Sequence, residues 1–275
     1  MKIVVLGAKG MLGHTVFHFL EQQNCHVIPF NERWSSDNAI QTMDKLKKLQ
    51  PSACVNAMGV MPGKGGSISE ALWVNGTLPG WISRHLPEDC LLIHASSDAV
   101  FADHSTGCRW NKIQNPDNDY GRSKRQGELG LLRKNDWMIR SSLLGLEAHT
   151  KRSLLSWFLA QKGRVSGYTN HMWNGITTLE WARVCWSILD SKMDPLQRVI
   201  QPGTLPPLSK YTLLKMVARI FEHPVDLQPV RASHSVQRSL VPNIPCDCIE
   251  SQLIALRDWW WKLKSGCSEG QRKNQ

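Results

Sequence analysis

The N-terminal stretch constrains the fold of this chain more than any other part of it. Residues 2–6 form a segment that is apolar from Ile3 to Leu6 and rich in Val and Ile, which is typical of a strand buried on both faces. A glycine-rich turn, Gly7 to Gly13, follows directly, and apolar residues at helical spacing come next. A second short apolar segment covers 26–30. The order strand, turn, helix, strand predicts a βαβ unit.

The three glycines of the turn have separate roles in a phosphate-binding site. Gly7 permits a tight turn, Gly10 lets the backbone approach a pyrophosphate, and Gly13 lets the helix pack closely on the strand. The first helical turn then offers unpaired N–H groups to the phosphates. The spacing is G-x-x-G-x-x-G, a variant of the dinucleotide-binding turn, and its position after the first strand predicts a dinucleotide cofactor.

The residues after the second strand bear on the choice of cofactor. An acidic residue here holds the ribose hydroxyls of NAD, whereas an arginine favours the 2′-phosphate of NADP. The chain has both, as Glu32 and Arg33. The sequence therefore leaves NAD and NADP open and leans toward NADPH.

The pattern continues with further buried strands at 53–57, 91–95 and 137–140, separated by helical segments. We predict an α/β fold with a Rossmann-like, doubly wound parallel sheet in residues 1–146. Residues 147–264 are expected to form a smaller C-terminal substrate-binding lobe whose chain returns to the first domain. The polar residues 265–275 are expected to be a disordered tail.

Polar side chains cluster where this sheet would bind ligands. Ser97 and Asp98 follow the fourth strand, and ligands bind at the carboxyl ends of parallel strands. Tyr120 and Lys124 are four residues apart, so in a helix they share one face. An adjacent lysine lowers the pKa of a phenol by stabilising the phenolate. Such a tyrosine can exchange a proton during carbonyl reduction.

Composition limits the kinds of ligand and partner that the chain can be expected to bind. No apolar run reaches the roughly 18 residues of a membrane span, and eight cysteines without framework or zinc spacing indicate reduced thiols in a cytoplasmic protein without a metal. Lys and Arg exceed Asp and Glu by 33 to 23, which favours anionic ligands. No basic platform interleaved with aromatic residues indicates nucleic acid. Candidate anchors for a substrate diphosphate are Lys64, Arg109, Lys151 and Arg152.

With these residues in place, the chain resembles the extended short-chain dehydrogenase/reductase superfamily, and within it the dTDP-4-dehydrorhamnose reductase-like branch. The resemblance spans most of the chain. It rests on the glycine-rich turn, Val55-Asn56-Ala57, Val74-Asn75, Ser96-Ser97-Asp98-x-Val100-Phe101, Tyr120-Gly121-Arg122-Ser123-Lys124 with Glu128, Ile139-Arg140-Ser141-Ser142, Gly167-Tyr168-Thr169-Asn170, Asn174-Gly175-Ile176-Thr177-Thr178 and Ser209-Lys210-Tyr211.

The resemblance implies a role for each site residue. Tyr120 would protonate the nascent alkoxide, Lys124 would tune the phenol and bind the nicotinamide ribose, and Ser97 would bind the substrate oxygen. Asp98 and Asn174 would contact the sugar. The residues implied in cofactor binding are Gly7, Gly10, Met11, Leu12, Gly13, Arg33, Asp37, Asn38, Ala57, Met58, Tyr120 and Lys124.

The implied activity is NAD(P)H-dependent reduction of a keto-deoxy-sugar nucleotide in the synthesis of surface polysaccharide or of nucleotide sugars. A homodimer is compatible with the family. Ala99, the basic segment 107–112 and Leu143 depart from the family's pattern around the expected sugar site. Two alternatives stay open: a nucleotide-sugar epimerase or dehydratase, and a catalytically silent NAD(P)-binding regulatory subunit.

Overall fold

A six-stranded, entirely parallel sheet forms the centre of the molecule in this computed structural model, which describes residues 1–63 and 65–272. The first strand, β1, lies between β2 and β3, so the chain reverses its direction of travel across the sheet beside β1. The strands in spatial order are β10 (Val199–Ile200), β5 (Asp136–Arg140), β4 (Leu91–Ser96), β3 (Ala53–Asn56), β1 (Lys2–Leu6) and β2 (His26–Phe30).

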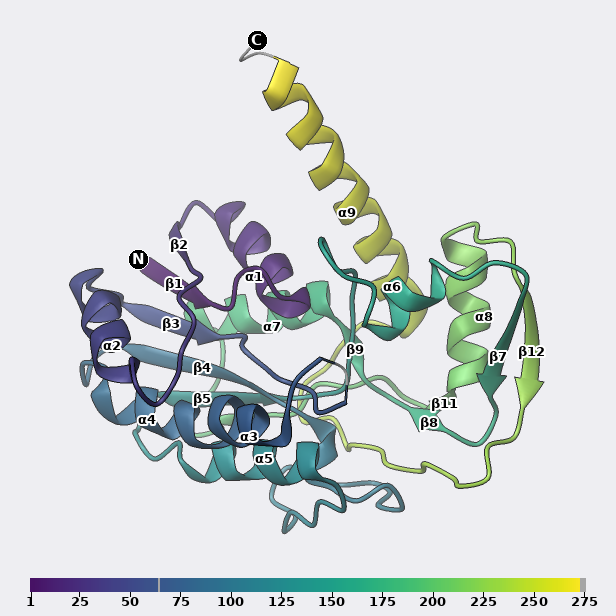
Figure 1. Cartoon of the computed structure of the whole chain (residues 1–275), viewed down its shortest axis with the longest axis horizontal. Helices are drawn as coiled ribbons and strands as arrows, with labels where there is room; N and C mark the ends of the chain where they lie inside the picture. The colour runs from purple at the N-terminus through teal and green to yellow at the C-terminus, as the bar shows by residue number, and fades with distance from the viewer. Residues whose placement is uncertain (64, 273–275) are drawn as a thin grey trace.

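Helices cover both faces of the sheet (Figure 1). One face carries α1 (Met11–Glu21) and α7 (Thr178–Leu189), and their apolar sides meet alternate residues of the strands in one core. The other face carries α2 (Ala39–Lys48), α4 (Leu78–His85) and α5 (Asp119–Leu129). The predicted doubly wound, Rossmann-like sheet is therefore confirmed.

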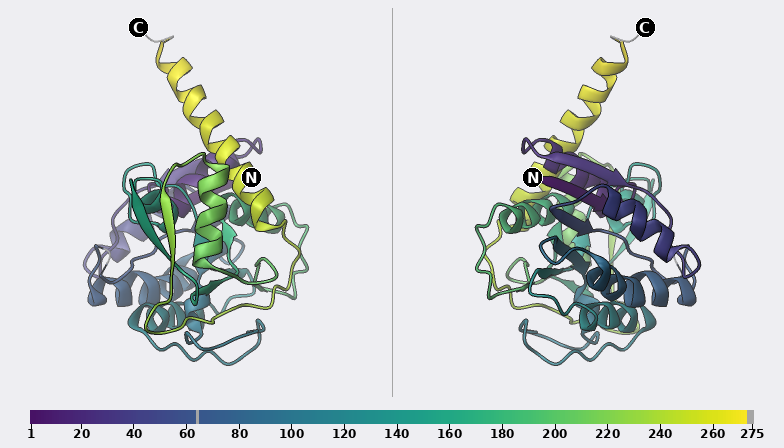
Figure 2. Two further views of the ribbon diagram at one scale, coloured as in Figure 1. Left: turned by 90° about the vertical axis from the view of Figure 1, so that its right-hand side faces the viewer. Right: turned by 90° about the vertical axis from the view of Figure 1, so that its left-hand side faces the viewer.

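A second, smaller core lies beside the carboxyl ends of the strands, formed by helices from the C-terminal half (Figures 1 and 2). Its elements are α6 (Leu154–Phe158), β7 (Arg164–Tyr168), β8 (Met172–Trp173), β11 (Leu208–Ser209), α8 (Lys210–Ile220), β12 (Asp226–Val230) and α9 (Ile249–Arg272). Two short strands, β6 (Leu143–Leu144) and β9 (Ile176–Thr177), pair in parallel at the junction.

The chain crosses back to the sheet from this half. Strand β10 pairs with β5, and α7 packs against α1, so both halves contribute to one sheet and its covering layer. The boundary at residue 146 stays a prediction. Helix α9 continues to Arg272 where a disordered tail was expected from residue 265, and residues 273–275 lie outside the described part.

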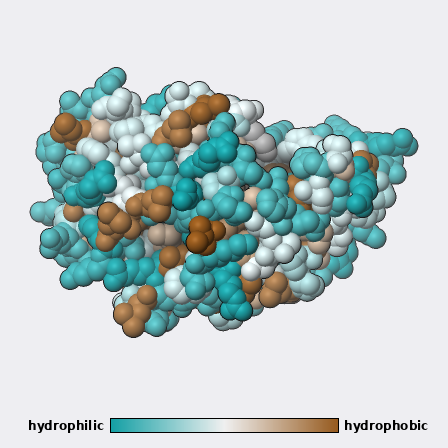
Figure 3. Space-filling model, turned by 90° about the horizontal axis from the view of Figure 1, so that it is seen from below, coloured by the Kyte–Doolittle hydropathy of each residue, from teal (hydrophilic) through white to brown (hydrophobic). Residues whose placement is uncertain are grey.

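Two properties of the described part of the chain concern contact with membranes and with other apolar surfaces. No helix among the described residues is long and apolar enough to cross a membrane. On the face seen in Figure 3, small apolar patches lie among hydrophilic residues, so this face offers no broad apolar surface.

The closest backbone approach in the N-terminal unit is at Gly13. A Cβ atom there would lie 2.1 Å from the carbonyl oxygen of Gly7, and Gly7 itself has a φ of +75°. Both glycines are therefore required by the geometry of the turn. This explains how α1 begins directly beneath the end of β1.

We expect Gly13→Ala to lower the free energy of unfolding by about 1–3 kcal/mol, because the methyl group would overlap backbone atoms that cannot move aside. Gly59→Ala is the matched control: its Cβ would lie 3.6 Å from Lys124 Nζ, an ordinary contact. Urea unfolding of the two variants would measure the difference. Equal stability would show that α1 can shift away from the strand at little cost.

Candidate active site

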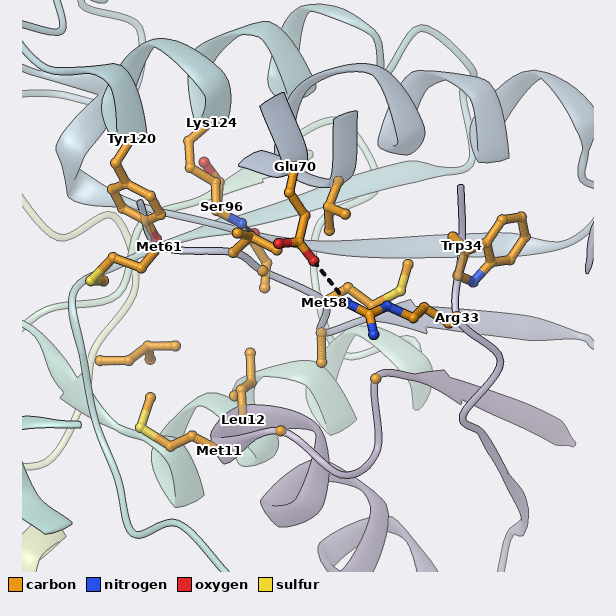
Figure 4. Close-up of a pocket in the computed structure, with 18 of the residues that line it drawn as sticks. Met11, Leu12, Arg33, Trp34, Met58, Met61, Glu70, Ser96, Tyr120 and Lys124 are labelled. Carbon is orange, nitrogen blue, oxygen red and sulfur yellow. Dashed lines mark hydrogen bonds and ion pairs between the residues drawn. The ribbon is translucent and has the colours of Figure 1, made fainter. Parts of the chain in front are cut away.

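A cavity of about 530 Å³ opens at the carboxyl ends of β1, β3 and β4. Figure 4 shows Tyr120 and Lys124 extending from α5 toward it, with Met11 and Leu12 of α1 on the opposite wall. The lining residues are Gly7, Gly10, Met11, Leu12, Asn31, Glu32, Arg33, Trp34, Ala57, Met58, Gly59, Val60, Met61, Glu70, Val74, Ala95, Ser96, Tyr120, Lys124 and Leu143. Most of the residues that the sequence assigned to the cofactor thus meet in one cavity.

The phosphate-binding turn fits an anionic group. Gly10 is the N-cap of α1 and offers no side-chain cap, and no acidic residue occupies the first helical turn. The N–H groups of that turn and the positive end of the helix dipole therefore face the cavity beside Gly7 and Gly10. Gly13 does not line the cavity, since it packs against Gly7 beneath the turn.

The loop after β2 presents Arg33 at the cavity edge. Its side chain is 91% exposed and makes one weak ion pair, 3.5 Å from Glu70 (Figure 4). Glu32 is paired with Lys45 at 2.6 Å, so it is the less available of the two cofactor-selecting residues.

The two other loop residues assigned to the cofactor lie outside the cavity lining. Asn38 shapes the loop, because its amide donates to the Arg33 carbonyl and accepts from the Ser35 N–H. Asp37 accepts a hydrogen bond from the Ser36 hydroxyl. That they lie near the adenine stays a prediction.

Tyr120 and Lys124 occupy one face of α5, as their spacing predicts. Lys124 is buried, and its Nζ donates to the carbonyl oxygen of Ala95 at 3.0 Å. Burial lowers the pKa of Lys124 to about 8, although the carboxylate of Glu128 acts in the opposite direction. The ammonium therefore still predominates near neutral pH.

The pKa of Tyr120 differs from the sequence-based expectation. Burial raises it to about 12, a hydrogen bond with Ser97 lowers it, Asp98 raises it and Arg238 lowers it. Lys124 is not among the groups that shift it, so the lowering of the phenol pKa by Lys124 stays a prediction. A high pKa keeps the phenol protonated, as a proton donor requires.

Ser97 reaches Tyr120 from the end of β4. It caps the 3₁₀-helix η2 (Asp98–Val100), accepting from the Ala99 N–H at 3.2 Å, and its hydroxyl donates to Asp98 Oδ1 at 3.1 Å. The neighbouring Ser96, not Ser97, lines the large cavity. A glycine makes this approach of α5 to η2 feasible, because a Cβ at Gly121 would lie 2.0 Å from the Ala99 carbonyl oxygen.

Two buried asparagines hold backbone segments in place. Asn75, on the π-helix η1 (Leu72–Thr77) between α3 (Ile68–Ala71) and α4, bonds both backbone groups of Val60 and the hydroxyl of Ser123. Asn174, assigned to the sugar, is buried, and its amide pairs with both backbone groups of Leu240 at 2.8 and 3.1 Å. Neither Asn75 nor Asn174 lines the cavity, and Asn174 serves here to hold the returning chain.

Sequence reasoning missed Arg238. Its Nε lies 3.0 Å from Asp98 Oδ2, so the carboxylate expected to contact the sugar is already paired. Arg238 comes from a segment 140 residues further along the chain, and no local motif marks it.

A second cavity of about 430 Å³ borders the loop after β3 at Gly65. It is lined by Gly65, Lys151, Arg152, Leu154 and Trp157. Two of the four predicted diphosphate anchors therefore meet in this cavity. Arg109 lines neither cavity, and Lys64 lies outside the described residues.

Comparison with known proteins identifies a family. The model of the RmlD substrate binding domain matches residues 1–163, more than half of the chain. No curated protein matches the chain in sequence.

Solved structures share the fold. A dTDP-4-dehydrorhamnose reductase from Clostridium acetobutylicum has a TM-score of 0.82 at 17% identity, covering 95% of this chain and 100% of that one. The Bacillus anthracis dTDP-4-dehydrorhamnose reductase in complex with NADP gives 0.80 at 15%, covering 93% and 98%. A dTDP-glucose 4,6-dehydratase from the same organism, in complex with NAD, gives 0.71 at 15%, covering 95% and 97%.

The buried amine of Lys124 leads to a pH-dependent prediction for stability. The folded pKa is about 8 against 10.5 for the free side chain, so the cost of burying the charge is complete below about pH 8 and disappears as the pH rises toward 10.5. Lys124→Met should therefore unfold at higher urea than wild type near pH 7. The advantage should be on the order of 3 kcal/mol at most, reduced by the lost bond to Ala95, and should shrink above pH 8.

The exposed Lys47 offers the matched control, since Lys47→Met removes a solvated charge and should give no such pH-dependent difference. A stability difference between Lys124→Met and wild type that stays constant from neutral to alkaline pH would contradict the assignment.

Proposed function

The chain belongs to the family of the RmlD substrate binding domain, within the extended short-chain dehydrogenase/reductases, and from this we propose that it reduces a keto-deoxy-sugar nucleotide with NADPH or NADH. The observation that carries the proposal is the place of the Tyr120 phenol, which lines the cavity of about 530 Å³ together with the glycine-rich turn and lies one helical turn from Lys124. A proton donor so placed suits a carbonyl group that receives a hydride.

In this proposal, separate residues would bind the cofactor, donate the proton and bind the substrate. The turn at Gly7 and Gly10 and the first turn of α1 would bind the pyrophosphate. The ammonium of Lys124 would bind the nicotinamide ribose, and Tyr120 would give its proton to the substrate oxygen as negative charge develops there. The reduced nicotinamide supplies the hydride. Lys151 and Arg152 in the second cavity would hold the substrate diphosphate.

The pairing of Asp98 argues against dehydration. That reaction needs free acid and base groups beside Ser97, and Asp98 already accepts from Ser97 through one oxygen and from Arg238 through the other. Reduction requires no carboxylate at this position.

The first test is turnover with NADPH or NADH and a panel of 4-keto-6-deoxy-sugar nucleotides, followed by the loss of reduced-cofactor absorbance. Tyr120→Phe should lower kcat by about 10²–10⁴-fold, because the proton donor is lost. Tyr211→Phe is the control, since Tyr211 lines neither cavity. Cofactor binding without turnover of any substrate would favour a silent regulatory subunit, and product without net cofactor consumption would favour an epimerase.

The second test concerns cofactor choice. Arg33→Ala should raise the Kd of NADPH about tenfold and leave the Kd of NADH nearly unchanged, because the exposed guanidinium would pair with the 2′-phosphate that only NADPH carries. Titration calorimetry or fluorescence would measure both constants, with the exposed Arg84→Ala as control. Equal weakening of both cofactors would mean that Arg33 acts by shaping the loop instead.

A further inference from the structure

Arg238 lies between two carboxylates beside the proton donor. Its Nε donates to Asp98 at 3.0 Å, and its Nη1 donates to Asp103 at 2.6 Å and to the Phe101 carbonyl at 3.3 Å. The side chain is only 15% exposed, so these contacts are largely shielded from water. A planar guanidinium meets these acceptors with two nitrogens in a fixed geometry, whereas an ammonium has its donors on one freely rotating nitrogen.

Two hydrogen bonds lead from this arginine to Ser97, the serine that acts on the phenol of Tyr120. Arg238 holds Asp98 Oδ2, and Asp98 Oδ1 accepts the hydroxyl of Ser97 at 3.1 Å. Ser97 has one proton, which it donates to Asp98 in this structure, whereas the lowering of the Tyr120 pKa by Ser97 requires that proton to point at the phenolate oxygen. The orientation of the serine hydroxyl therefore depends on where Asp98 is held.

The segment that carries Arg238 is itself held in place by backbone hydrogen bonds to the chain that follows η2. Its backbone bonds run alongside 103–108, from Gln237 to Asp103, between Ser239 and Ser105, and from Cys108 to Ser239. Asn174 holds Leu240 from the other side. Arg238 is thus presented to Asp98 by a well-bonded backbone.

We propose that Arg238 is a positioning residue of the active site: it fixes Asp98, and through Asp98 it orients the Ser97 hydroxyl against the Tyr120 phenol. The catalytic meaning of this role rests on the proposed reductase function, but the geometry does not. The returning C-terminal segment thereby becomes a part of the machinery that places the proton donor.

The charges that face Tyr120 make the idea testable without a substrate. Asp98 of η2 and Arg238 of the returning segment act on the phenol with opposite signs, while Lys124, on the tyrosine's own helix, directs its Nζ to Ala95. The chain contains three tyrosines, Tyr120, Tyr168 and Tyr211, so NMR of protein labelled with ¹³C at the tyrosine Cζ gives three signals. The signal lost in Tyr120→Phe identifies Tyr120.

Alkaline titration of the cofactor-free protein should then show opposite shifts. Arg238→Ala leaves the Asp98 charge unneutralised and should raise the pKa of Tyr120, whereas Asp98→Asn should lower it, each by about one unit. Arg238→Lys keeps the charge and should leave the titration near that of wild type. Arg219→Ala, which removes an exposed ion pair with Glu250, is the matched control and should leave Tyr120 unchanged.

Kinetics complete the test. Arg238→Ala and Arg238→Lys should both lower kcat, by about tenfold or more, with the KM for the cofactor unchanged, because alanine leaves Asp98 without its partner and lysine lacks the fixed guanidinium geometry that positions it. Circular dichroism and thermal unfolding would show whether each variant folds. If Arg238→Ala does not fold, the kinetics of Arg238→Lys and the titration of Asp98→Asn still test the proposal.

The outcomes separate this inference from the proposed function. If wild type turns over no keto-sugar nucleotide, opposite shifts in the titration still support the role of Arg238. If turnover depends on Tyr120 but folded Arg238 variants keep both the titration and kcat of wild type, the role of Arg238 is overturned and the reductase stands. A lower melting temperature of Arg238→Ala with an unchanged Tyr120 titration and an unchanged kcat would mean that Arg238 is merely structural.

Discussion

The buried ion pair between Arg140 and Glu128 holds the parts of this site together. Arg140 ends β5 and Glu128 lies in the last turn of α5; their side chains are 2.6 Å apart and each 3% exposed. Two charges taken out of water are tolerated only when their remaining hydrogen-bonding groups are satisfied as well. Here Glu128 also accepts from Ser96 and Gln114, and Arg140 also donates to the Trp110 carbonyl and to Gln201.

This network fixes α5, and therefore Tyr120 and Lys124, relative to the end of β4. It also shows why the unusual segment 107–112 leaves the site intact. Arg140 and Gln201 bind that segment through the backbone carbonyls of Trp110 and Cys108, so most of its side chains can vary without breaking a bond. Trp110 is 45% exposed accordingly. A departure from the family's sequence pattern is thus compatible with the family's backbone.

The sequence predicted what depends on local geometry. The buried strands, the glycine-rich turn and the shared face of Tyr120 and Lys124 follow from periodicity and from helix and turn stereochemistry, all within a few residues. The phenol pKa and the partner of Asp98 could not be predicted in this way, because they depend on burial and on Arg238, which is 140 residues away. Asn174 shows the same limit: its motif indicated a sugar contact, yet its amide holds Leu240.

The two shifted pKa values together describe a site prepared for an anionic, hydrogen-bonding ligand. Lys124 is buried with its ammonium donating to a neutral carbonyl at Ala95, so part of its desolvation cost is uncompensated and its pKa falls. Lys124 is not among the groups that shift the phenol pKa, although it lies one helical turn away and its Nζ is directed to Ala95. The charges that act on Tyr120 come instead from Asp98 of η2 and from Arg238 of the returning segment, so the electrostatic environment of the phenol depends on contacts between distant parts of the chain.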